Sequence, residues 1–260
     1  MGMPLISIIT VSYNAVHTVE QTIKSVIDQT YPNIEYIIID GGSVDGTVDV
    51  IRKYSDKISY WISEPDAGIY DAMNKGIVRA KGKWINFMNC GDCFCDNSVL
   101  YNIASHCKDN IDVLYGNVVL HSSVGKYKVL PESLEAFSWH MAFCHQSSFV
   151  RTSLIKAHLF NLEFKYVADY ELFYSLYMEG KRFRYIDISV ASYQTDEGLT
   201  ASNMYKCFLE TYKVNNRAIN KTEIWKYKIR NFLIYNLPGI FVRWVRLRLY
   251  THNDRFIRLN

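Results

Sequence analysis

The sequence of 260 residues lacks the marks of a secreted or membrane-spanning protein. Residues 1–4 carry no basic side chain, and the apolar run over residues 5–11 is too short for a signal peptide. No run of about eighteen or more apolar residues occurs, so we expect no transmembrane helix. These absences predict a cytoplasmic protein.

Two glycine-rich nucleotide-binding motifs are also missing. No Gly-x-Gly-x-x-Gly follows the first predicted strand, and no Gly-x4-Gly-Lys-Ser/Thr occurs anywhere. The first absence argues against a Rossmann dinucleotide site and the second against a P-loop. A nucleotide, if one binds, must be held by a different arrangement of the chain.

Cysteine does not follow the pattern of a disulfide framework. Six cysteines are scattered through a chain without a signal peptide, which indicates reduced thiols: Cys90, Cys93, Cys95, Cys107, Cys144 and Cys207. The run Cys90-x2-Cys93-x-Cys95, followed by His106 and Cys107, leaves a zinc site as an alternative. A second well-spaced Cys-x2-Cys pair is missing, which favours buried thiols.

What the chain does contain is a large apolar fraction and an uneven distribution of charge. An apolar content of 49% suffices for a large core in one domain with a small appendage. Residues 221–260 hold nine Lys and Arg and two acids, a net charge of +7, so the total of +3 leaves −4 for residues 1–220. A basic tail behind a mildly acidic body indicates an anionic surface as partner.

Strand and helix patterns alternate over the first hundred residues. Strands separated by short helices predict right-handed βαβ units and an α/β fold with a single, mostly parallel sheet. The strand patterns cover residues 5–12, 34–39, 58–62 and 83–88, and the helix patterns cover residues 16–29, 47–54 and 69–80.

The pattern changes after Asp92. We expect a hairpin over residues 113–130, a strand at 147–151, a helix at 168–179 and an extended segment at 183–193. From residue 201 the patterns are helical and are broken at Pro238-Gly239. These observations predict a catalytic body over residues 1–200 and a helical, basic extension over residues 201–260.

Three segments place carboxylates and glycines directly after apolar strands. They cover residues 37–47, 63–76 and 87–92, and in an open α/β sheet this is where loops meet a ligand. Each has a simpler alternative. Asp40-Gly41-Gly42-Ser43 also suits an ordinary turn, and Asp66 also suits a helix N-cap.

Together, in this order and spacing, the three segments resemble the family 2 glycosyltransferases with the GT-A fold. The first strand of that family reads like residues 6–14, and its next motif is Val-Asp-Asp-Gly-Ser-x-Asp-Gly-Thr, which here reads Ile-Asp-Gly-Gly-Ser-Val-Asp-Gly-Thr over residues 39–47. The resemblance covers roughly the first 200 residues. Residues 63–76, with the later Gly91-Asp92, look like the subgroup that builds bacterial capsule, O-antigen and exopolysaccharide repeat units.

The resemblance implies roles for individual residues. Ser12 and Asn14 would line the nucleotide pocket, and Asp40 would accept a hydrogen bond from the base. Others would border the donor sugar and ribose. The implied nucleotide- and donor-binding residues are Ser12, Asn14, Asp40, Asp66, Asp71, Asn74 and Gly91.

The chain departs from the family at the metal-binding element. The family usually has Asp-Ser-Asp-Asp where this chain has Asn89-Cys90-Gly91-Asp92, so only the last acid remains. The resemblance therefore implies that Asp92 alone binds Mn²⁺ or Mg²⁺, together with the phosphates of the donor.

The family places its catalytic base in a Glu-Asp pair that opens a helix, and here the pair reads Ala168-Asp169. Asp169 would be the base, and a helix cap is the alternative. His145 and Gln146 would contact acceptor or diphosphate, although a buried structural histidine is equally plausible for His145. A loop at residues 197–200 would close over the donor.

These parts imply a metal-dependent, inverting hexosyltransferase. Asp169 would take the proton of an acceptor hydroxyl during a single in-line displacement, while a nucleoside diphosphate, with UDP favoured, leaves from the opposite face. Rival functions are a polyprenyl-phosphate sugar synthase, a nucleotidyltransferase and a non-catalytic nucleotide-sugar-binding protein.

The tail indicates where the enzyme works. Around residues 238–250, arginines alternate with bulky apolar side chains, which is typical of a basic amphipathic helix at an anionic membrane surface. We therefore expect a peripheral protein at the inner face of the cell membrane, with a polyprenyl-diphosphate-linked glycan as acceptor. Packing of this helix on the body, or a homodimer contact, is the alternative. A nucleic-acid partner is not expected, because the basic residues lie in one apolar-rich tail.

Overall fold

The first part of the chain builds four parallel strands, as the alternating patterns predict. The structure is a computed structural model that describes all residues except 1, 195–202, 237–247, 249, 251–252 and 260. β1 (Ile6–Ser12) has β2 (Ile34–Asp40) on one side, with β3 (Tyr60–Ser63) beyond it, and β4 (Trp84–Phe87) on the other. The register pairs Ser12 with Asp40 and Asp40 with Ser63, so three strands end side by side.

Beyond β4 the ten-stranded sheet is mainly antiparallel. β8 (Ser148–Arg151) pairs with β4 and with β6 (Val113–Ser122), and the predicted hairpin joins β6 to β7 (Gly125–Val129). β9 (Phe183–Gln194) runs parallel to β6 and antiparallel to the short β5 (Cys93–Phe94). The expected mostly parallel sheet therefore applies to the first four strands, because a hairpin and short connections reverse the chain afterwards.

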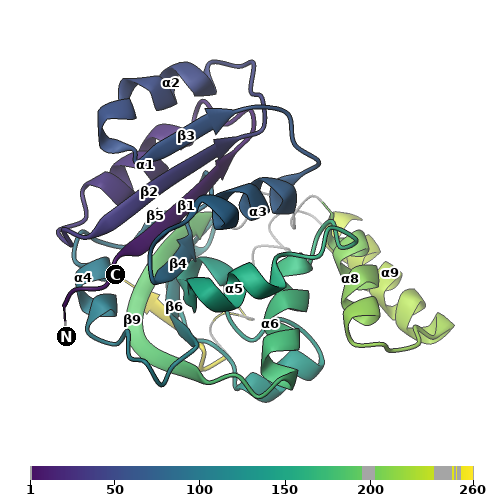
Figure 1. Ribbon diagram of the computed structural model, residues 1–260. Helices are drawn as coiled ribbons and strands as arrows, with labels where there is room; N and C mark the ends of the chain where they lie inside the picture. The colour runs from purple at the N-terminus through teal and green to yellow at the C-terminus, as the bar shows by residue number, and fades with distance from the viewer. Residues whose placement is uncertain (1, 195–202, 237–247, 249, 251–252, 260) are drawn as a thin grey trace.

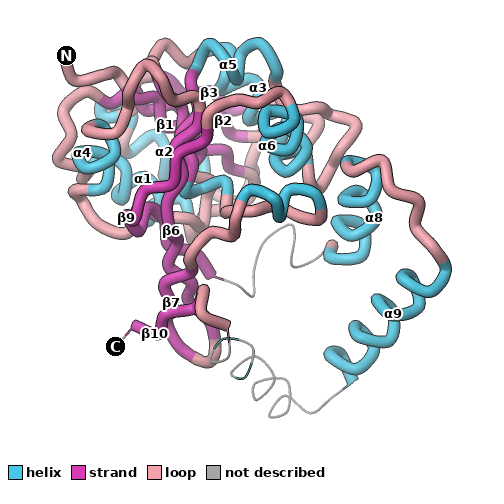
Figure 2. The backbone as a smooth tube through the Cα atoms, turned by 90° about the horizontal axis from the view of Figure 1, so that it is seen from below, coloured by secondary structure: helices cyan, strands magenta, loops and turns pink. Residues whose placement is uncertain are grey.

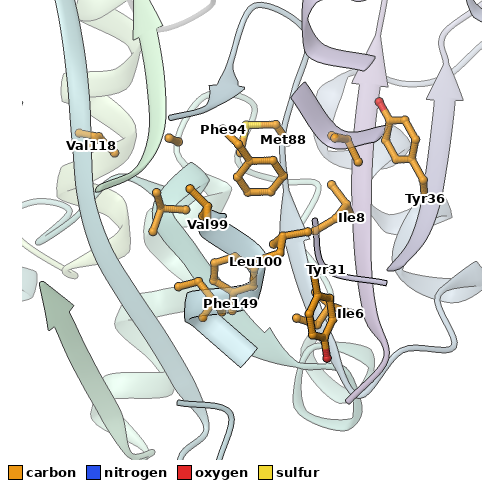
Figure 3. Close-up of a cluster of buried hydrophobic side chains, with 14 of the residues drawn as sticks. Ile6, Ile8, Tyr31, Tyr36, Met88, Phe94, Val99, Leu100, Val118 and Phe149 are labelled. Atoms are coloured by element: carbon orange, nitrogen blue, oxygen red, sulfur yellow. The ribbon is translucent and has the colours of Figure 1, made fainter. Parts of the chain in front are cut away.

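Helices cover both faces of the sheet (Figure 1). Alternate side chains of β1 point to opposite faces, so Ile6 and Ile8 enter one core and Ile9 and Val11 the other. Figure 3 shows the first core, with Leu100 and Phe149 beside the β1 side chains. The helices on that face are α1 (Val19–Ile27), α2 (Thr47–Lys53) and α4 (Val99–Ala104). Those on the other face are α3 (Ile69–Arg79), α5 (Thr152–His158) and α6 (Ala168–Met178). Short 3-10 turns lie at Ser55–Lys57, Leu134–Ser138 and His145–Ser147.

The helices α8 and α9 follow residue 202. α8 (Met204–Val214) packs on α6 and buries Cys207 and Val214 in the second core, and α9 (Lys221–Asn236) packs on α8 through Tyr227 and Phe208, whose ring centroids are 4.5 Å apart. Figure 2 shows α9 standing away from the sheet. None of the described helices combines the length and apolar character needed to span a bilayer.

The end of the chain differs from the helical extension that the sequence predicts. β10 (Phe256–Leu259) returns to the sheet and pairs antiparallel with β7 (Figure 2). The predicted amphipathic helix at 238–250 lies outside the described residues, apart from Arg248 and Tyr250, and so does the predicted donor loop at 197–200.

Candidate active site

Asp40 lies at the centre of the loops that follow β1, β2 and β3. Its fully buried carboxylate accepts hydrogen bonds from the hydroxyls of Ser12 (2.8 Å), Ser43 (2.6 Å) and Ser63 (2.7 Å). The backbone N–H groups of Gly42 and Ser43 also donate to it, at 3.1 and 2.8 Å. Burial alone would raise the pKa of Asp40, but these bonds outweigh it and lower the pKa.

This saturation differs from the role that the sequence implies for Asp40. A carboxylate offers about four lone-pair directions, and five donors of the chain already use them. Asp40 therefore holds the loops together and has no acceptor left for a base. Ser12 serves the same network, because its hydroxyl donates to Asp40.

Asn14 joins the loop after β1 to the loop after β2. It adopts a φ of 47°, its backbone N–H donates to the Ser43 hydroxyl (2.8 Å), and its side-chain Oδ1 accepts from the backbone of Val44 (3.0 Å). Asn14 shapes the rim of the site rather than its interior. The neighbouring Tyr13 is not among the predicted site residues, and 67% of its surface is exposed.

Asp66 and Asp71 organise the start of α3. Asp66 Oδ1 accepts the backbone N–H of Gly68 at 2.8 Å, and Asp71 Oδ2 accepts that of Ala67 at 3.0 Å. The N-cap of α3 is Gly68, so Asp66 closes the turn before the helix and the N-cap alternative for Asp66 is wrong. Lys75 lies behind this turn, with its Nζ 2.9 Å from Glu64 and 3.9 Å from Asp71.

Asn74 does not face the donor region in the way the sequence implies. Its side-chain amide donates to the backbone oxygen of Phe160 (2.9 Å) and accepts the backbone N–H of the same residue (2.8 Å). Both ends of the amide are used in this pair. Asn74 therefore fixes α3 against the segment after α5, which is a positioning role.

The turn after β4 carries Asp92. Gly91 has a φ of 97°, a conformation that favours glycine, and its N–H donates to Thr22 Oγ1 at 3.1 Å. Burial raises the pKa of Asp92 to about 6, although His145 and a hydrogen bond from Gln146 act to lower it. Because those two partners only partly offset the burial, the Asp92 carboxylate would gain from a cation.

His145 lies between Asp169, the predicted base, and the turn that carries Asp92, the predicted metal ligand. Its Nδ1 lies 3.0 Å from Asp169 Oδ2, and its Nε2 lies 3.3 Å from Asn89 Nδ2. The neighbouring Gln146 bonds to Asp92. A continuous series of contacts therefore leads from Asp169 through His145 and the adjacent Gln146 to Asp92, although these residues come from three separate segments.

Asp169 lies in the first turn of α6 and accepts a second hydrogen bond, from the Tyr70 hydroxyl at 2.9 Å. Its side chain keeps 19% of its surface exposed, so solvent reaches it. Burial would raise the pKa of Asp169, but His145 and Tyr70 together lower it. Burial also acts to lower the pKa of His145, and Asp169 and Asp92 outweigh it and raise that pKa. Each side chain therefore favours the charged form of the other.

The described residues contain no group of three or more His, Cys, Asp or Glu that could hold a metal ion. The zinc alternative therefore finds no support: Cys90, Cys93 and Cys95 are free thiols whose pKa values are raised by burial. The turn after β4 does fit an ion that takes few protein ligands. Besides Asp92 it carries Asn89 Oδ1, a buried oxygen without a hydrogen-bond partner in the described structure.

Comparisons with known proteins agree with this geometry. Residues 7–165, more than half of the chain, match the family model described as glycosyl transferase family 2. The chain belongs to this family. The glycosyltransferase has the GT-A fold of S. aureus TarS, residues 1–349, solved in complex with UDP-GlcNAc; the TM-score is 0.68 at 17% identity, over 93% of this chain and 79% of that one.

Two curated relatives match different shares of the glycosyltransferase. It is 27% identical over 224 residues to a PGL/p-HBAD biosynthesis glycosyltransferase of Mycobacterium bovis, which is 84% of this chain and 87% of the relative. It is 36% identical over 134 residues to the Escherichia coli UDP-Glc:alpha-D-GlcNAc-diphosphoundecaprenol beta-1,3-glucosyltransferase, which is 50% of this chain and 53% of the relative.

Three residues of the site were not predicted from the sequence. Tyr70 and Asn89 lie inside the motifs, but only the fold brings their side chains to Asp169 and His145. Tyr13 gave a weak signal, as an aromatic residue between two polar ones directly after a strand.

Proposed function

We propose that this glycosyltransferase moves a sugar from a UDP-sugar to a hydroxyl of a lipid-linked glycan, with inversion at the anomeric carbon. The observation that carries the proposal is the position of His145, which lies 3.0 Å from Asp169 and 3.3 Å from Asn89, on the turn that also carries Asp92. A direct displacement needs a base for the acceptor hydroxyl and positive charge near the leaving diphosphate. Asp169 would be the base, and Asp92 would hold the cation.

Asp169 is the base in this proposal. Its lowered pKa keeps it ionised at neutral pH. His145, the Tyr70 hydroxyl and the backbone of Tyr170 bond to its carboxylate, which leaves about one of its four lone-pair directions for an acceptor hydroxyl. The acceptor oxygen forms its bond to the anomeric carbon as its proton passes to Asp169. The bond from that carbon to the diphosphate oxygen breaks on the opposite face, and UDP leaves.

Asp92 would hold Mn²⁺ or Mg²⁺, with the unpartnered Asn89 Oδ1 on the same turn as a neutral oxygen. A bound cation would supply positive charge for the leaving diphosphate. Gln146 bonds to the Asp92 carboxylate and so fixes its orientation in the absence of the ion. Because only one carboxylate of the protein would bind the metal ion, we expect the metal affinity to depend on the phosphates of the donor.

The choice of donor and acceptor rests on relatives and on charge. The E. coli relative uses, by its name, UDP-glucose and a diphosphoundecaprenol-linked GlcNAc. A membrane-side location is part of this proposal. It is supported by α9, where Trp225 is 65% exposed among the exposed Lys221, Lys226 and Lys228, on the side opposite the buried Tyr227. A lipid-linked acceptor and an enzyme at the same surface would meet in two dimensions.

The test is release of nucleoside diphosphate by the purified full chain with Mn²⁺, a panel of nucleotide sugars and a polyprenyl-diphosphate-linked sugar. We expect acceptor-dependent release of UDP and a product of inverted configuration. Asp169→Asn should lower kcat by about 10²–10⁴-fold, and Asp92→Asn by about a hundredfold or more.

The exposed Asp49, which pairs with Arg52 on α2, offers a matched control, and Asp49→Asn should keep the wild-type rate. Wild-type turnover by Asp169→Asn would contradict the role of Asp169. Transfer to bare polyprenyl phosphate instead of the lipid-linked sugar would replace this proposal with the polyprenyl-phosphate sugar synthase.

A further inference from the structure

The protein must tell one nucleobase from another if it uses a single donor, and this inference rests on the proposed function. Uracil presents a ring N–H between two carbonyl groups, whereas cytosine has an unprotonated ring nitrogen at the same position. A site that selects uracil therefore needs an acceptor aimed at this N–H. The sequence implies Asp40, but the five hydrogen bonds around its carboxylate leave it no free direction.

Gly41, the next residue, opens a space beside Asp40 that another carboxylate fills. A Cβ at position 41 would lie 2.5 Å from Asp66 Oδ2, so this oxygen rests directly on the Gly41 backbone. The same Cβ would lie 3.3 Å from the ring of Tyr13. Where the family motif has its second Asp, this chain has a glycine, and the carboxylate of Asp66 comes from the loop after β3 to the same place.

One carboxylate oxygen of Asp66 accepts no hydrogen bond from the described residues. Its Oδ1 is held by the N–H of Gly68, while no donor among the described residues bonds to Oδ2. The adjoining Tyr13 ring is 67% exposed, which leaves a flat aromatic surface beside a free acceptor. An aromatic face and a carboxylate oxygen at its edge form a complementary pair for a planar base with a ring N–H.

We propose that Asp66 Oδ2 is the nucleobase-reading group: it accepts the ring N–H of uracil while the base stacks on Tyr13. Asp40 then acts as a positioning residue, because its hydrogen bonds fix the loop on which Gly41 lies. The shape of the site depends on Gly41 being a glycine, since any side chain there would displace the Asp66 carboxylate.

The decisive variant is Asp66→Asn. The amide oxygen would stay with the Gly68 N–H, which places the NH₂ group where Oδ2 stands and turns the acceptor into a donor. Calorimetric titration of the full chain with UDP and with CDP, in Mn²⁺ and without acceptor, measures the result. We expect UDP to bind about tenfold or more weakly, CDP to bind more tightly, and the preference for UDP over CDP to collapse.

Gly41→Ala is the second variant. Gly41 is not in the left-handed region, and the new Cβ meets the flexible end of Asp66 and the edge of the exposed Tyr13 ring, so the chain should fold normally while UDP affinity falls about tenfold. Asp49→Asn again serves as the control and should leave both affinities unchanged.

The outcomes separate this assignment from the proposed function. An unchanged ratio of UDP to CDP affinity in a folded Asp66→Asn protein would overturn the assignment and leave the proposed function in place. A wild-type protein that binds neither nucleotide would instead overturn the proposed function, and the assignment with it.

Discussion

At the scale of the residue, the properties of Asp169 depend on its partners. Burial disfavours its charged form, whereas His145 and Tyr70 favour it, and the balance lowers its pKa. The pKa of His145 is raised instead, because Asp169 and Asp92 stabilise its protonated form and outweigh the effect of burial. The pair titrates as a unit, so removing either side chain changes the proton affinity of the other.

The variant His145→Ala tests this coupling through the pH profile. Asp169 must be ionised to act as a base, so kcat/KM rises with pH through its pKa and levels off above it. Without His145 the burial remains but the hydrogen bond and the positive charge are lost, so the pKa of Asp169 rises. We expect the acid limb of kcat/KM to move to higher pH, with a smaller loss on the plateau than the 10²–10⁴-fold typical of losing a base.

His140, an exposed histidine paired with Glu132, provides the control, and His140→Ala should keep the wild-type profile. An acid limb that stays in place in His145→Ala would show that the proton is held elsewhere than on Asp169.

The candidate site was predictable where residue type and order carry the signal. Asp92 and Asp169 follow from their motifs, and the structure links both to one histidine. Pairwise contacts were not predictable, because His145 and Asp169 are 24 positions apart and meet only after η3 (His145–Ser147) packs near α6. The saturation of Asp40 was hidden for the same reason: its serine partners come from three different loops.

At the scale of the element, α8 holds the segment that leads into α6. Glu210 on α8 accepts the backbone N–H groups of Lys165 (3.0 Å), Tyr166 (2.8 Å) and Val167 (3.2 Å). These groups precede the first turn of α6, where a helix leaves its N–H groups without partners of its own. The start of α6, and with it Asp169, is therefore fixed by a helix that the sequence assigns to the accessory extension.

Glu210→Ala should act on both stability and rate. The loss of charged hydrogen bonds should lower the free energy of unfolding by about 1.5–3 kcal/mol, and displacement of Asp169 should lower kcat about tenfold or more. Chemical denaturation and initial rates measure the two effects. Glu163→Ala, an exposed glutamate in the neighbouring loop, should change neither quantity. If Glu210→Ala loses stability but keeps its kcat, α8 does not position Asp169.

Elements that follow a clear apolar pattern were predictable. β1, β2, α3 and α6 lie within one or two residues of their predicted starts, because each buries a regular apolar face. β5, with two residues, is too short for a period to show, and α5 was not predicted. β10 is set by a long-range pairing with β7, which no local pattern in a basic tail indicates.

At the scale of the whole molecule, charge and shape both distinguish the last forty residues from the rest of the chain. The last forty residues carry a net charge of +7 and the rest −4. α9 stands away from the sheet in Figure 2, whereas β10 ties the end of the chain back to β7. α9 has an exposed face, defined by Trp225, Ile229 and the flanking Lys226 and Lys228. The helix before α9 packs on the body and β10 pairs with β7, so the chain is held to the body both before and after this face.

This arrangement predicts binding to anionic membranes. The full chain should sediment with vesicles that contain phosphatidylglycerol, less so at high salt, and not with neutral vesicles. The double variant Lys226→Glu, Lys228→Glu should weaken this binding by roughly thirtyfold or more, since each basic residue near an anionic surface contributes about 1 kcal/mol and each new Glu adds repulsion. Lys53→Glu with Lys57→Glu makes the same change of charge on exposed lysines of the body, at the end of α2 and in the turn after it. Equal losses in the two double variants would mean that net charge alone, and not the α9 face, draws the protein to the membrane.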